Sequence, residues 1–132
     1  MSKSAYLSGK LLDHLYGGPD YTRPATVYVA LFADAALTTE LSGNGYARAA
    51  VPNNATNWPA ATGGSKANGA AIVFAAATGD WAQAGAWGLY DASAGGNLLY
   101  TGALAAPVTV LNGETARFAA GDLVITEADG DA

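Results

Sequence analysis

The chain has 132 residues, a formal net charge of −5 and no cysteine, and only 13% of its residues are charged. This length corresponds to a single domain over residues 1–132, and the absence of cysteine excludes disulfides, thiolate metal sites and cysteine nucleophiles. Because phosphate backbones and anionic bilayers repel an acidic protein, we expect neither nucleic acid nor a membrane as a partner.

A short amphipathic helix is predicted over residues 4–16, near the start of the chain. Ser4 is a suitable N-cap, and the sequence Gly17-Gly18-Pro19 ends the pattern. The apolar stripe has four-residue spacing and consists of Leu7, Leu11 and Leu15. Because about 13 residues form only a marginal helix in isolation, we expect the stripe to pack on the domain's own sheet or on a neighbouring subunit.

Short strands separated by turns are predicted for the rest of the chain. The clearest, residues 26–33, is apolar on both faces and should be covered on both sides. The other predicted strands span 45–51, 70–77, 87–91, 98–104, 108–111, 115–120 and 123–126. Asn112-Gly113 is expected to close a hairpin between 108–111 and 115–120. Residues 52–69 are predicted to form an irregular loop suited to contact, and residues 127–132 a loose acidic tail.

The number and spacing of these elements predict the fold class. Seven to eight short strands with turn signals between them are typical of an all-β architecture. We therefore expect a mainly β protein, an antiparallel β-sandwich or barrel with one short N-terminal α-helix.

No catalytic, cofactor or metal pattern stands out, so we predict that the protein is not an enzyme. His14, the only histidine, is expected to be a solvated helix side chain. Four acidic residues near predicted strand ends could supply a glycosidase-type pair, although acidic residues at turns commonly bond the local backbone. They are Asp80, Asp91, Glu114 and Asp122. Asp129-Gly130-Asp131 lacks the other ligands of an EF-hand loop, so we expect no metal site there.

The three tryptophans divide between core and contact roles. In a domain with few large apolar residues, Trp81 and Trp87 are expected in the core. Trp58 lies in the loop rich in Asn and Pro and is a candidate contact residue. The predicted partner contact consists of Leu7, Leu11, Leu15 and Trp58. Trp58 and the loop tyrosines also leave open a carbohydrate-binding module.

A succession of short motifs over residues 4–126 resembles a known family. In chain order they are the leucine helix, TVYVALF at 26–32, ELSGNGYAR at 40–48, ATGDW at 77–81, WGLYD at 87–91, GGNLLYTGAL at 95–104 and FAAGDL at 118–123. Their order and spacing are similar to those of small tailed-bacteriophage virion proteins that are commonly labelled phage tail fibre proteins. The resemblance implies a structural, non-catalytic protein of the virion, assembled in the host cytoplasm, whose partners are other virion proteins.

Within the virion, a single domain without repeats or coiled coil suits a capsid decoration (cement) protein, bound to the shell of major capsid proteins. A small tail fibre, tail-tip or adaptor component is the alternative position. In either position we expect a homo-oligomer, because closed symmetry favours dimers or trimers. A trimer would match the local three-fold positions of a shell.

Overall fold

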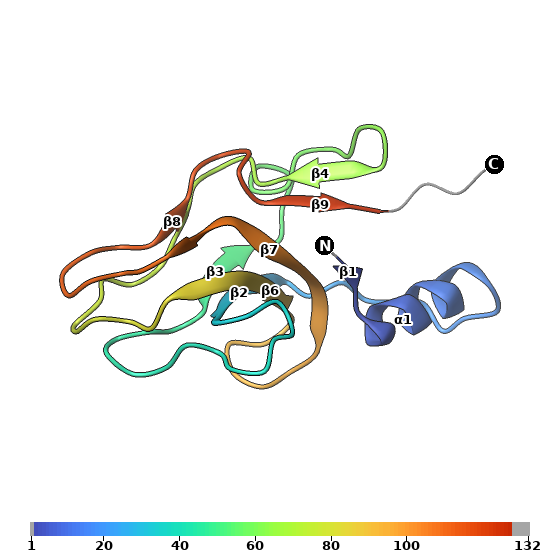
Figure 1. Ribbon diagram of the computed structural model, residues 1–132. Helices are drawn as coiled ribbons and strands as arrows, with labels where there is room; N and C mark the ends of the chain where they lie inside the picture. Colours follow the sequence, from blue (N-terminus) through green and yellow to red (C-terminus); the bar gives the residue numbers. More distant parts are fainter. Residues whose placement is uncertain (1, 128–132) are drawn as a thin grey trace.

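The computed structural model describes residues 2–127 and shows a mainly β, antiparallel fold with one short helix, which confirms the predicted fold class (Figure 1). The helix is α1 (Ala5–Leu15), and Ser4 is its N-cap, because the Ser4 Oγ accepts a hydrogen bond from the Leu7 N–H at 3.1 Å. The strands are β1 (Ser2–Lys3), β2 (Thr26–Phe32), β3 (Ala49–Pro52), β4 (Ser65–Ala67), β5 (Ile72–Val73), β6 (Ala84–Tyr90), β7 (Leu98–Val108), β8 (Arg117–Phe118) and β9 (Val124–Thr126).

Five strands form the main sheet, in the order β1-β7-β6-β2-β3, and each neighbouring pair is antiparallel. β2 and β6 lie next to each other in the interior of the sheet, in a register that sets Leu31 opposite Trp87. Residues 29–32 of β2 are all buried. The sheet is therefore covered on both faces at this strand, as its two apolar faces predicted.

A second layer is built from two small sheets, β4-β9 and β5-β8, and from the loops that join them (Figure 1). Ile72 of β5 and Leu123, next to β9, belong to the same buried cluster as Val29 of the main sheet. Trp81 and Trp87 also belong to this cluster, which confirms their predicted place in the core. The core therefore lies between the main sheet and the second layer, as in a sandwich.

One glycine is required where β7 passes an indole ring of β6. A Cβ built at Gly102 would lie 2.5 Å from Cζ2 of Trp87, closer than packed carbon atoms approach each other. The absence of a side chain at Gly102 therefore lets the Trp87 ring lie directly against the neighbouring strand.

The predicted hairpin across Asn112-Gly113 is wrong, although the turn itself forms. β7 already ends at Val108, and β8 pairs with β5. The segment 110–118 runs antiparallel to 72–81, for example through a 2.8 Å hydrogen bond from the Trp81 N–H to the Val110 carbonyl. An Asn-Gly pair indicates where a chain turns, but burial of the flanking apolar side chains decides which segment it then pairs with.

Other strand boundaries also differ from the predicted ones. The strands predicted at 45–51 and 70–77 are shorter, as β3 and β5, and the loop predicted at 52–69 contains β4. β1, which pairs with β7, was not predicted. These segments are rich in small or polar residues, which give a weak periodic signal, so tertiary pairing decides where they become strands.

Candidate functional site

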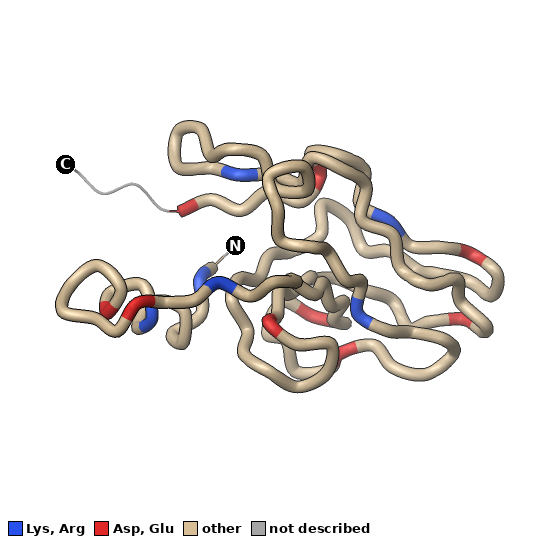
Figure 2. The backbone as a smooth tube through the Cα atoms, turned by 180° about the vertical axis from the view of Figure 1, so that it is seen from behind, with Lys and Arg blue, Asp and Glu red and all other residues tan. Residues whose placement is uncertain are grey.

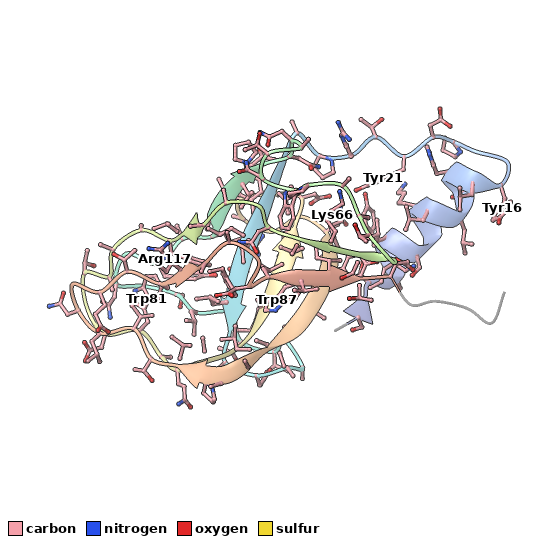
Figure 3. All side chains as sticks on the ribbon, turned by 90° about the horizontal axis from the view of Figure 1, so that it is seen from above. Tyr16, Tyr21, Lys66, Trp81, Trp87 and Arg117 are labelled. Carbon is pink, nitrogen blue, oxygen red and sulfur yellow. The ribbon has the colours of Figure 1, made fainter. Side chains whose placement is uncertain are left out.

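The most conspicuous feature of the molecule is an arm, residues 5–25, formed by α1 and the segment that returns from it to β2. The arm projects from one end of the sheet (Figure 1), and Tyr16 lies at its outer end (Figure 3). His14 joins the two halves of the arm, because its Nδ1 accepts a 3.0 Å hydrogen bond from the Tyr21 N–H. His14 is exposed, as predicted, and this hydrogen bond is to the backbone of the returning segment.

α1 packs on the domain only as far as Leu11. Leu7 is buried in the main core, and Tyr6 and Leu11 pack against it as partly buried residues. Beyond them, Leu12, Leu15 and Tyr16 are 59%, 66% and 74% exposed. We refer to these three residues as the arm tip. Three large apolar side chains that gather on one projecting element are a candidate contact surface.

A pocket of about 520 Å³ lies at the base of the arm. Its apolar wall brings together α1, the main sheet, the 53–60 loop and β9. The residues of this wall are Leu7, Val27, Trp58, Leu89, Leu99 and Ile125. Its polar lining includes Tyr21, Arg23, Asn53 and Lys66. Figure 3 shows Tyr21 and Lys66 near one another where the arm meets the body. We refer to this hollow as the basal pocket.

Trp58 contributes to the wall of the basal pocket and is itself only 7% exposed. Its indole Nε1 is buried and has no hydrogen-bond acceptor among residues 2–127. A buried N–H without an acceptor is uncommon in folded proteins, so this wall of the pocket is incompletely satisfied in a single chain. Lys66 lies across the same loop and donates from its Nζ to the Pro59 carbonyl at 2.9 Å.

The four predicted contact residues are thus distributed along the arm and its base. Leu7 and Trp58 come together at the basal pocket, Leu11 is half-buried, and Leu15 is exposed at the arm tip. Leu12 and Tyr16 extend the exposed surface, and the sequence could have indicated them through their position beside the leucine stripe. The cationic lining, Arg23 and Lys66, carries no sequence signal, because residues distant in the chain form it.

Near the arm, β1 and β7 are joined to the end of β9. The Glu127 carboxylate accepts hydrogen bonds from the Lys3 ammonium and the Tyr100 hydroxyl. Hydrogen bonds from Lys3 and Tyr100 lower the pKa of Glu127, whereas burial and the neighbouring carboxylate raise the pKa of the Tyr100 phenol. Glu127 opens the predicted acidic tail, and residues 128–132 lie outside the described residues.

A polar cluster joins the loop between β2 and β3 to the loop between β6 and β7. The Arg48 guanidinium donates two hydrogen bonds to the Glu40 carboxylate, from Nε at 3.0 Å and from Nη2 at 2.9 Å. It also donates to the carbonyls of Ala92 and Gly95, and Tyr46 donates its hydroxyl proton to Glu40 at 2.7 Å. Partial burial alone would raise the pKa of Glu40, but these hydrogen bonds lower it below its usual value. A carboxylate held in this way stabilises the fold rather than taking up a proton.

Three of the four acidic residues weighed as a catalytic pair bond nearby turns. Asp80 accepts from the Asn112 N–H at 2.8 Å, Asp91 from the Asn97 N–H at 2.7 Å, and Glu114 from the Leu111 N–H at 2.8 Å. Asp122 is exposed. Within residues 2–127, no group of three or more His, Asp and Glu side chains could hold a metal ion. The local roles of these carboxylates are those that acidic residues ordinarily have in turns.

Comparison with known proteins identifies the family of the chain. The family described as "Podophage GP4 fiber I protein gp80" matches residues 2–126, nearly the whole chain, so the protein belongs to this family. The match confirms the resemblance to phage tail fibre proteins and supports a structural protein of the virion. A comparison with curated proteins gives no match. Among the described residues there is also no helix with the length and apolar character needed to span a bilayer.

Proposed function

Because the chain belongs to a podophage fibre family, we propose that it is a small, non-catalytic subunit of the fibre apparatus of a tailed phage, which acts by binding other virion subunits. The observation that carries this proposal is the arm tip, which a single chain leaves exposed on an element that projects from the body. The roles of Asp80, Asp91 and Glu114 in turns favour a structural function over a hydrolytic one.

The arm tip can supply a useful share of binding free energy. Full burial of a leucine or aromatic side chain contributes about 1.5–3 kcal/mol. Since Leu12, Leu15 and Tyr16 are each more than half exposed, a partner that covers all three would gain about 3–5 kcal/mol from the apolar surface. Such a contribution would form the centre of a specific interface, and polar contacts around it would set the orientation.

A capsid decoration protein bound to the major capsid protein is a second candidate. The favouring observation is that residues 2–127 form one sandwich-like body with a single projecting arm, which suits repeated attachment to a shell. In that position the subunit would stabilise the capsid by mass action. The burial of the Trp58 side chain disfavours a carbohydrate-binding module, because that alternative depends mainly on an accessible Trp58.

The position in the particle can be tested by labelling and counting. Antibodies against this chain, bound to purified virions and viewed by electron microscopy, should label the tail, and quantitative mass spectrometry should give a few to a few tens of copies per particle. Hundreds of copies with label over the head would favour the decoration role. Absence of the chain from washed particles would refute both positions.

A further inference from the structure

We propose that the arm tip of one copy docks into the basal pocket of a second copy of this chain. The inference deepens the proposed structural function, on which its biological meaning rests, by naming the partner and the two surfaces that meet. It joins the two features that a single chain leaves incomplete: an exposed apolar end and a partly open apolar hollow.

The apolar chemistry of the two surfaces matches. The pocket of about 520 Å³ has aliphatic and aromatic side chains on its wall, among them Leu7, Leu89 and Leu99. The arm tip presents two leucines and one tyrosine, which are of the size and character that such a hollow accepts. In addition, the Trp58 Nε1–H in the pocket wall is buried and has no acceptor among residues 2–127, so the wall lacks one hydrogen bond in a single chain.

The charges near the two surfaces are opposite in sign. Arg23 and Lys66 line the pocket, and among residues 2–127 no acidic residue lines it with them. In the sequence, Asp13 and Asp20 flank Leu15 and Tyr16 of the arm tip, and no lysine or arginine occurs from residue 12 to residue 20. Figure 2 shows the acidic positions of the arm away from its junction with the body, with one basic position beside them. In a chain of net charge −5, two copies would generally repel each other, so this local complementarity selects the tip-to-pocket approach.

The contact cannot form within one chain. Leu7 lines the pocket and Leu15 lies eight residues further along the same helix, so about 12 Å of rigid α1 separates them. Each copy therefore carries both halves of the contact and must use a neighbour for each. Such a contact either closes into a small ring or reciprocal pair, or continues as a chain of subunits. Both outcomes need no third protein.

Self-association of the purified chain tests this proposal. Sedimentation velocity over a range from 1 µM to 1 mM should show species heavier than the 13.2 kDa monomer as the concentration rises. The double variant Leu12→Ser/Leu15→Ser should raise the dissociation constant about tenfold or more. Leu111→Ser, which removes an exposed leucine far from the arm, is the matched control and should leave association unchanged. Circular dichroism of each variant establishes that it folds.

Charge exchange tests the orientation. Arg23→Glu should weaken association, as should Asp13→Arg, because each sets like charges against one another in the docked pair. The chain that carries both substitutions should recover association, since the two reversed charges again attract. Arg117→Glu, at an exposed position on β8, is the control for a change of net charge alone.

A photo-crosslinking amino acid at position 16 identifies the neighbour directly. In solution and in intact virions, it should crosslink to peptides of a second copy from the 53–66 segment, which contributes Trp58 and Lys66 to the pocket. A strictly monomeric chain at 1 mM, an arm variant that associates like wild type, or a crosslink from position 16 only to a different virion protein would overturn the proposal. These results would leave the virion position intact, because labelling and copy number measure that position independently.

Discussion

The Glu40–Arg48 cluster gives the sharpest test of what holds the 33–48 and 91–97 loops in place. Replacement of Arg48 by alanine removes two hydrogen bonds to Glu40, two to backbone carbonyls and the stacking of the guanidinium over Tyr90, whose ring centroid lies 3.9 Å away. Removal of one partner of a buried ion pair costs about 3–5 kcal/mol. Because the Glu40 side chain is 27% exposed, we expect a loss near the lower end, about 3 kcal/mol.

Urea unfolding followed by tryptophan fluorescence measures this loss at pH 7, and thermal unfolding should show a fall in Tm of about 10 °C. Arg117→Ala is the matched control, because Arg117 is exposed, and its change should stay within about 0.5 kcal/mol. If Arg48→Ala were no more destabilising than Arg117→Ala, the cluster would contribute nothing and the reasoning would be refuted.

The same cluster predicts a pH dependence. The pKa of Glu40 is lower in the folded protein than in the unfolded chain, so its stabilisation is fully present above the unfolded pKa of about 4.3 and is lost as the pH falls through the folded pKa. Acidification from pH 6 to pH 2.5 should therefore destabilise the wild type more than Arg48→Ala, in which the shift has lost its principal cause. Parallel pH profiles for the two proteins would contradict this assignment.

The remaining predictions concern packing, turn chemistry and the tyrosines. Gly102→Ala should destabilise the fold by about 1–3 kcal/mol in urea unfolding, because its methyl group would meet the Trp87 ring, while Gly9→Ala in the open face of α1 should be neutral or slightly stabilising. Equal stability of the two variants would exclude the close approach of β7 to the ring. Asp91→Ala should cost about 1–2 kcal/mol, because it removes the hydrogen bonds to the Asn97 N–H and side-chain amide, whereas Asp122→Ala should have no effect. In an absorbance titration at 295 nm, two of the seven tyrosines, Tyr46 and Tyr100, should ionise well above the usual range, since burial and the neighbouring carboxylates raise the pKa of both. Tyr100→Phe should remove one of these late transitions, and a titration unchanged by it would refute the link to Glu127.

The elements that the sequence predicts best are those in which local chemistry and tertiary packing agree. β2 is apolar on both faces and is buried on both, and α1 begins at the serine that caps it. The hairpin at Asn112-Gly113 fails because a turn signal is local, whereas the pairing of β8 with β5 depends on apolar residues about 45 positions apart in the chain. A sequence alone does not rank such distant partners.

The candidate site is predictable only along the helix. The leucine spacing indicates an apolar stripe, and the structure shows which part of it the domain covers and which part it leaves exposed. The basal pocket draws Arg23, Trp58 and Lys66 from separate segments, so no local pattern could predict it. The Glu40–Arg48 pair is similar, because an arginine eight residues after a glutamate has no special meaning until the loop between them folds back.

We propose that this chain acts in the virion by association through its arm. The most direct measurement complements a phage that lacks the chain with either wild type or Leu12→Ser/Leu15→Ser and quantifies the chain in purified particles by mass spectrometry, with Leu111→Ser as the control. We predict that the wild type and Leu111→Ser enter particles in equal amounts and that the arm variant, although folded, is reduced about tenfold or more. Equal incorporation of all three chains, or particles that are complete and infectious without any of them, would contradict this proposal.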